Sequence, residues 1–591
     1  MSVIKLPQFL SIVDSQTKSM SHDELEQFIH EIARKLPEKQ RDDFIDLINQ
    51  IISIKNIGSS AISNDNGETD VKNQILNIIP KLEKINSGEV CLESEYNEEW
   101  DDWYNSDAEE ILFFDPQKLL PDIVKAIRLV HKCVDLELYE DGSKLCEVVC
   151  YLEIYADGDY NDYDGSPLGI EDLFNKDLID GDLESFMKEA LYLMYVGNEL
   201  SCRADEMYCL YERFGRGRVS IENILQMGNH ELPEFDEFLP LWTEYLGKQS
   251  GRNASELLKE AQLMIKDDFT LLENARKYVV EHPELFLQLL QMKTDSNEEF
   301  KMIEIGMEAV ASVPDRLKIR GKMALWTAYY ADKACRFDVR EKYWLEALRS
   351  DTSVINYMRI KFLPWNAKQY DEEIIFIVKS VYEKSKKTNG RYSYFEENMR
   401  ENSISSNEYC TILFFEQELD SMVKIGMSIK ENLGWSSTFM KEGMALLMLL
   451  LYQGVSYTVG MKSMLRRAIQ ACGFSKESLY FGTDEKDDKE DSEVFCEIFE
   501  KWKDSVTLSD GEINKWIGKV EIWIQRRVSG IMDANKRNYY GECAEFIAAF
   551  GEMKESLGIP GAKARIMESY KVEYSRRRAF HEELRRYGMH K

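Results

Sequence analysis

The chain has 591 residues and a net charge of −32 at neutral pH. Hydrophobic residues make up 44% of it, which is enough for sizeable cores and excludes wholesale disorder. The charge argues against broad binding of nucleic acid or an anionic membrane by the body of the protein, because both would repel it. With only 12 prolines and 32 glycines, the composition favours helices over turn-rich β architecture.

The first predicted element is a pair of helices. Ser21 and Glu24 form an S-x-x-E capping box, and apolar residues follow at helical spacing on both sides of Pro37. We therefore expect an αα-hairpin over residues 1–55. The first residues lack the apolar run typical of a secretory signal, so we expect none. Polar composition predicts a polar and acidic linker over 56–110.

The most acidic window of the chain is 93–110, which contains nine acidic and no basic side chains. Aromatic residues lie among the carboxylates: Trp100, Trp103 and Tyr104. Such a segment can dock a partner, because the rings anchor while the carboxylates steer. The alternative is a solvated loop whose rings fold back onto the protein. The three aromatic residues are our candidates for a partner-binding segment.

Helical spacing of apolar residues continues after this window. We predict a helical domain over 111–250 and TPR-like helix pairs over 251–385, because pairs of about 35 residues with prolines at helix ends are typical of α-solenoids. Small residues stand where such helices would cross closely: Ala261, Ala275, Ala309, Ala324, Ala328, Ala331 and Ala347. The predicted fold class is all-α, either a TPR-like α-solenoid or an irregular helical repeat array.

A second polar linker is predicted over 386–407, followed by a C-terminal helical domain over 408–591. Within this domain, Gly443 to Met461 carries no charge. Its continuous apolar part is too short to cross about 30 Å of hydrocarbon, so we expect a buried helix and no membrane span.

The last 32 residues, 560–591, reverse the charge of the chain. They hold nine basic and four acidic side chains, a net charge of +5, which leaves −37 for the remainder. We expect a basic terminal helix with an apolar stripe. Three interpretations stay open: the helix caps the acidic body, binds a protein partner, or binds nucleic acid. The candidate contact residues are Arg576, Arg577, Arg578, Arg585 and Arg586.

Catalytic motifs are missing from the sequence. It contains no G-x-S-x-G, Walker-type phosphate loop, H-E-x-x-H or G-x-G-x-x-G pattern. We therefore predict no catalytic residue, no cofactor-binding residue and no metal ligand.

Two segments resemble metal-binding patterns in part. Asp157 to Asn161 begins like an EF-hand loop, but Asp162 and Leu168 occupy the positions that need glycine and a bidentate glutamate. Whether this loop binds a cation stays open. The second segment is a His-x-Cys pair followed by Cys-x-x-x-Cys. His131 and Cys133 stand two apart, and residues at this spacing on a helix point in different directions, so a joint metal site is disfavoured. The cysteines are expected to be buried packing residues: Cys133, Cys146 and Cys150.

Two blocks near the C-terminus resemble large helical bacterial proteins related to the SWIM zinc-finger proteins. The blocks are Leu433 to Ser437, and Asn538 to Ala544 continued by Tyr574 to Phe580. A third segment, Tyr343 to Asp351, looks like a repeat of the same group. These proteins are generally uncharacterised, and the resemblance implies a bacterial helical protein. The SWIM pattern itself, C-x-C followed by C-x-H, is missing, so neither zinc nor a role in DNA binding is carried over.

The function expected from the sequence is that of a non-enzymatic, cytoplasmic scaffold or regulator. Its acidic surface would select a protein partner with a basic surface. The alternative is a nucleic-acid-associated protein that uses the basic C-terminal helix, and the third class is an enzyme without a recognisable motif. The eleven scattered cysteines favour free thiols in a reducing compartment.

Overall fold

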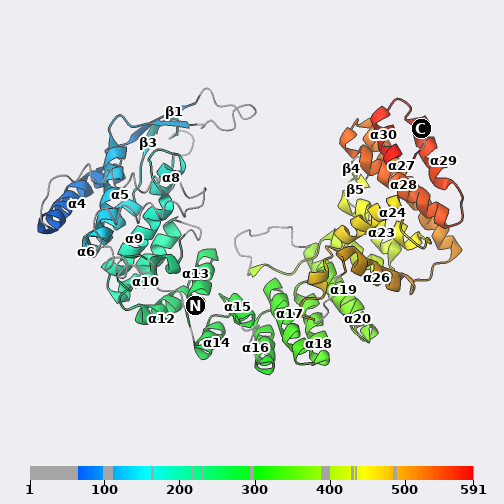
Figure 1. Cartoon of the computed structure of the whole chain (residues 1–591), viewed down its shortest axis with the longest axis horizontal. Coiled ribbons are helices and arrows are strands. Elements are labelled where there is room, and N and C mark those ends of the chain that lie inside the picture. The colour runs from blue at the N-terminus through cyan, green and yellow to red at the C-terminus, as the bar shows by residue number, and fades with distance from the viewer. Residues whose placement is uncertain are drawn as a thin grey trace, which may run out of the picture. The chain divides into compact units, whose positions relative to one another are not determined.

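The fold is mostly α-helical, as the composition predicted. It divides into two compact units, unit 1 (Met1–Asp267) and unit 2 (Asp268–Lys591). Figure 1 shows the helices of each unit. The hairpin predicted over 1–55 lies outside the described residues. The computed structural model describes residues 64–97, 111–160, 165–214, 219–225, 227–228, 230–265, 267–292, 298–387, 399–427, 431–432, 435–483 and 489–589.

Unit 1 combines packed helices with a small three-stranded sheet. The helix α6 packs on α9 and on α5, and α12 packs on α13. The helices are α4 (Asn64–Asn86), α5 (Leu119–Asp135), α6 (Tyr139–Cys150), α8 (Ile170–Asn175), α9 (Leu183–Gly197), α10 (Leu200–Phe214), α11 (Ile221–Leu225), α12 (Phe235–Leu246) and α13 (Arg252–Met264).

The sheet of unit 1 has the strand order β2-β1-β3. The central strand β1 runs antiparallel to β2 and parallel to β3. In this register Glu93 lies opposite Phe114 and Leu92 lies opposite Ala156. The strands are β1 (Leu92–Tyr96), β2 (Ile111–Phe114) and β3 (Ala156–Gly158).

Part of the region 56–110, which we predicted to be a linker, is structured. Residues 64–97 contain α4 and β1, so the prediction of a linker is wrong for them. The reason is an apolar stripe at helical spacing inside polar sequence, and this stripe is buried: Val71, Ile75, Ile78, Leu82 and Ile85.

The first part of unit 2 is a succession of helices that each pack on the next. Figure 1 shows this succession from α14 to α20, in green to yellow-green. It begins inside the segment 251–385, because the boundary between the units falls at Asp267. The elements are α14 (Asp268–Lys277), α15 (Glu284–Met292), α16 (Glu299–Ser312), α17 (Lys318–Lys333), α18 (Phe337–Ser350), α19 (Val354–Phe362), the 3-10 helix η2 (Ala367–Tyr370) and α20 (Asp371–Ser385).

Small side chains allow helices in both units to approach closely. The seven alanines that the sequence placed at helix crossings are all buried. At Gly306 on α16, a Cβ atom would collide with the hydroxyl of Thr327 on α17. Helix pairs are therefore held by contacts that a larger residue would break.

The second part of unit 2 begins within the predicted linker 386–407. Asn402 lies in it and donates from Nδ2 to the carbonyl of Arg349 at 2.8 Å, which fixes this stretch against α18. A capping box of Ser405 and Glu408 then starts α21. The elements that follow are α21 (Ser406–Phe415), α22 (Leu419–Gly426), β4 (Glu431–Asn432), β5 (Trp435–Ser436), α23 (Ser437–Leu451), α24 (Val459–Ala471), α25 (Lys476–Leu479), α26 (Asp491–Lys503), α27 (Asp510–Asp533), the 3-10 helix η4 (Arg537–Tyr539), α28 (Tyr540–Ser556), α29 (Ala562–Glu573) and α30 (Arg578–Arg586).

The uncharged segment 443–461 contributes most of α23, and every residue from Met444 to Tyr452 is buried. The expected buried helix is confirmed there. In the part of the chain that the structure describes, no helix has the length and apolarity needed to span a bilayer.

The basic C-terminal segment forms two helices, α29 and α30, where we predicted one. Both pack on α28. The side chains of Phe580 and Leu584 are fully buried, and the Phe580 ring meets that of Tyr540 edge to face at 5.7 Å. The chain turns between Glu573 and Arg578, and each helix buries apolar side chains of its own, Met567 on α29 and Phe580 and Leu584 on α30.

We predict that unit 2 depends on the packing of α30 more than on its charge. Phe580→Ala is expected to lower the free energy of unfolding by about 3–5 kcal/mol, because it leaves a cavity in a filled core. Arg585→Ala, which removes an exposed side chain of the same helix, should change it by less than about 0.5 kcal/mol. Scanning calorimetry of the full chain measures both. Equal losses for the two variants would contradict a packing role.

Candidate functional site

The candidate residues from the sequence fall into two groups. Trp100, Trp103 and Tyr104 lie outside the described residues. The five arginines are all described. Arg577 is half-buried and donates to the side-chain oxygen of Asn535 and, at 2.9 Å, to the carbonyl of Met532. It therefore fastens the start of α30 to the end of α27.

The other four arginines are exposed. Arg586 forms an ion pair with Glu583 at 2.9 Å. Among the described residues, no carboxylate forms an ion pair with Arg576, Arg578 or Arg585, so the +5 segment keeps an exposed basic surface on unit 2.

The three cysteines of the metal-like pattern in unit 1 are packing residues, as predicted. Cys133, Cys146 and Cys150 are completely buried, and burial raises the pKa of the Cys133 thiol to about 12. His131 instead lies at the surface, with Nδ1 2.6 Å from the carboxylate of Glu189. Within the described ranges, no group of three or more His, Cys, Asp or Glu side chains is placed to hold a metal ion.

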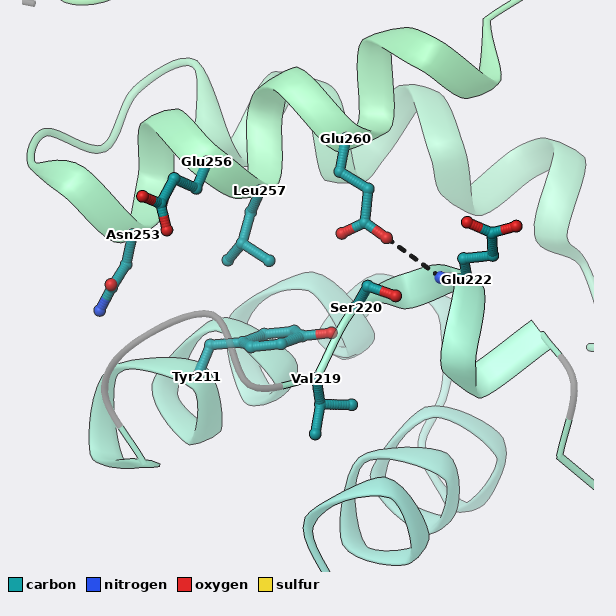
Figure 2. A pocket seen from close by; sticks show the side chains of 8 residues that line it. All are labelled: Tyr211, Val219, Ser220, Glu222, Asn253, Glu256, Leu257 and Glu260. Atoms are coloured by element: carbon teal, nitrogen blue, oxygen red, sulfur yellow. Dashed lines mark hydrogen bonds between the residues drawn. The ribbon is translucent and has the colours of Figure 1, made fainter. Parts of the chain in front are cut away.

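Unit 1 contains a pocket that the sequence analysis did not identify. Its volume is about 290 Å³, and it lies between α10, α11 and α13 (Figure 2). The residues that line it are Tyr211, Val219, Ser220, Glu222, Asn253, Glu256, Leu257 and Glu260.

Four of the lining residues form one stripe along α13. Asn253, Glu256, Leu257 and Glu260 stand at i, i+3, i+4 and i+7, so they share a helix face. The opposite face is buried in the unit through residues such as Leu258. This arrangement brings two carboxylates to the side of the helix that faces the pocket.

The start of α11 supplies the facing wall. Ser220 precedes the helix, and its hydroxyl and backbone N–H both donate to the side-chain oxygen of Asn223 at 2.9 Å. The backbone N–H of Glu222 donates to Oε1 of Glu260 at 3.1 Å. Glu260 therefore caps the first turn of α11 and fixes it against α13.

The carboxyl of Glu260 is held in a partly dehydrated position. Burial raises its pKa above the ordinary value, against the lowering effect of the N–H groups at the start of α11. Figure 2 shows its second oxygen directed away from the hydrogen bond to Glu222, over the side of the pocket where Tyr211 lies. Burial therefore makes the charged form of this carboxylate costly.

The hydroxyl of Tyr211 is buried and has no hydrogen-bond partner among the described residues. The residue is only 6% exposed, and its ring packs against Trp242 with the ring centroids 6.1 Å apart. Burial raises the pKa of this phenol well above its ordinary value, and the nearby Glu260 raises it further. An unpaired buried hydroxyl is uncommon, because it costs free energy that a ligand or water would recover.

The other polar groups of the pocket are paired. Glu256 accepts from Nε of Arg252 at 2.7 Å, and Asn253 donates to Glu212 at 3.0 Å. In the described residues no cation forms an ion pair with Glu260. The pocket therefore combines a partly dehydrated carboxylate that has no cationic partner among the described residues with a hydroxyl that is unpaired there, a chemistry that suits a cationic N–H donor.

Comparison of the chain with protein-family models finds no match, and comparison with curated proteins finds no significant match.

We predict that Tyr211→Phe does not destabilise unit 1. The lost hydroxyl has no partner, so the free energy of unfolding should stay equal or rise by up to about 1 kcal/mol. Tyr195→Phe is the matched control, because the buried Tyr195 hydroxyl donates to the carbonyl of Pro233 at 2.8 Å. Removal of the Tyr195 hydroxyl should lower the free energy of unfolding by about 0.5–1.5 kcal/mol. Urea denaturation measures both variants, and an equal loss in the two would show that the Tyr211 hydroxyl is satisfied.

Proposed function

We propose that the protein is a non-enzymatic, cytoplasmic scaffold or regulator of bacterial origin that binds a protein partner with a basic surface. The observation that carries the proposal is the pocket of unit 1, where, among the described residues, Glu260 has no cationic partner and the Tyr211 hydroxyl has no hydrogen-bond partner.

Two further properties support a scaffold. The helices α14 to α20 pack one on the next, an order that supports the proposal of a TPR-like solenoid, a class of fold that presents extended binding surfaces. The net charge of −32 attracts a basic partner from a distance and repels acidic molecules.

The test is capture of the partner at two salt concentrations. The full chain is immobilised at its C-terminus and exposed to an extract of the native host. It should retain a basic protein in stoichiometric amount at about 0.01 M salt. It should release this protein at about 1 M salt, because charges are then screened beyond about 3 Å. The purified partner should bind again on its own. A partner that stays bound at high salt, or no partner at all, would contradict the proposal.

A second candidate function rests on the C-terminal arginines. Arg576, Arg578 and Arg585 are exposed and form no ion pair with any described carboxylate, which favours phosphate contacts. Under this alternative, the protein binds nucleic acid through α30 and the turn before it.

Binding of nucleic acid by these arginines predicts a specific salt dependence of the affinity for DNA. Replacing the three arginines with glutamine should reduce the slope of log K against log salt by about 2.7 for duplex DNA, since each phosphate contact contributes about 0.9. Fluorescence anisotropy at several salt concentrations measures the slope. The triple variant is preferable to deletion of 560–591, because deletion also removes the buried Phe580 and Leu584. Identical slopes for the variant and the natural chain would exclude these arginines as the contact.

A further inference from the structure

We propose that the pocket of unit 1 binds the guanidinium group of a single arginine side chain of the partner. The inference rests on the proposed function, because it names the group by which a basic partner is recognised. It is drawn from the juxtaposition of the Glu260 carboxylate and the unpartnered Tyr211 hydroxyl in one cavity.

Among the described residues, Glu260 lacks the basic partner that other carboxylates of the chain have. In unit 2 the buried Glu552 meets Lys563 at 2.6 Å, and the half-buried Glu542 meets Arg527 at 2.8 Å. Glu260 is held instead by the N–H groups at the start of α11. A cationic ligand would give this carboxylate the partner that the other two have within the described chain.

The size of the cavity fits one side chain. Its volume of about 290 Å³ lies at the lower end of the range for small-ligand pockets, so a larger organic ligand would not be enclosed. Val219 and Leu257 supply apolar walls, which suit the methylene stem of a long basic side chain.

The arrangement of the acceptors favours arginine over lysine. Glu260 and the Tyr211 hydroxyl approach the cavity from opposite walls, and a planar guanidinium presents five N–H donors around its edge. Figure 2 shows the Tyr211 ring edge-on, with one face towards α13, a position in which a guanidinium can stack on it. An ammonium group is more strongly hydrated, so its transfer into the pocket costs more.

Glu260 also has a structural role, which determines the choice of variant. Its Oε1 accepts from the N–H of Glu222, and Glu260→Gln keeps a side-chain oxygen for this hydrogen bond while it removes the charge. The matched control is Glu147→Gln, because Glu147 is an exposed residue of α6 in the same unit and does not line the pocket.

The experiment is calorimetric titration of the full chain with three peptides that differ at one central position: arginine, lysine or citrulline. The arginine peptide should bind at least threefold tighter than the lysine peptide and at least tenfold tighter than neutral citrulline. Glu260→Gln should weaken binding of the arginine peptide about tenfold, and Tyr211→Phe severalfold without loss of stability. Glu147→Gln should bind as the natural chain does.

Argininamide is the fourth ligand, because a guanidinium can also come from a small molecule. Tighter binding of the peptide than of argininamide supports recognition of a protein side chain. Equal binding of the two would overturn that assignment. Equal binding of the arginine and citrulline peptides would contradict recognition of a guanidinium group by the pocket. Unchanged binding of the arginine peptide by Glu260→Gln and Tyr211→Phe would contradict it as well.

The chain has arginines of its own next to the pocket in sequence. Arg216 and Arg218 precede Val219 and lie outside the described residues. If replacing both with glutamine leaves the affinity for the arginine peptide unchanged, the site is free for a partner. If it raises the affinity, the chain itself competes for the pocket, and the assignment to a partner fails.

Failure of this inference is distinguishable from failure of the proposed function. If a basic partner is captured in a salt-sensitive way and neither Glu260→Gln nor Tyr211→Phe changes this capture, the scaffold function is supported and the pocket is excluded as the binding site. The absence of any such partner would reject the scaffold.

Discussion

Close packing of helices at residues with small side chains is the constraint on which both units depend. In unit 1 a Cβ atom at Gly142 of α6 would lie 2.8 Å from the Cβ of Cys133 on α5. In unit 2 buried alanines line the crossings of α16, α17 and α18. Interiors filled in this way leave little room for water, so a buried polar group that finds no partner in the protein costs free energy.

This constraint explains why the pocket between α10, α11 and α13 differs from its surroundings. The helix α11 is only five residues long, and the pocket lies where it meets the polar stripe of α13. Glu260 serves two purposes there, as the cap of α11 and as a carboxylate at the wall of a cavity. The first purpose explains why the residue can be held in a dehydrated position, and the second is the basis of the proposed recognition of a cation.

The sequence predicts the helical class and several of its contacts, because these depend on spacing within one segment. The burial of the alanines follows from the helical spacing of apolar residues, and the burial of Met444 to Tyr452 follows from the apolar composition of that stretch. The helix α4 was missed because its apolar stripe is embedded in polar residues next to an acidic window. The turn between α29 and α30 was missed because α28 is the surface on which both helices pack, and α28 is separate in sequence.

The pocket could be predicted only in part. The spacing of Asn253, Glu256 and Glu260 places polar side chains on one face of α13, which is a signal that the sequence contains. Nothing in the sequence indicates that Tyr211 of α10 lies opposite, or that its hydroxyl lacks a partner, since both depend on the packing of helices some forty residues apart.

The most direct measurement is the titration of the Glu260 carboxyl by carbon-13 NMR, with Glu260→Gln to identify the signal. Burial without a cation predicts a midpoint above the ordinary value of 4.5 in the free chain. The arginine peptide should lower this midpoint, because a bound cation favours the ionised carboxylate. A midpoint at the ordinary value, or one that the arginine peptide does not change, would contradict recognition of a guanidinium at this site.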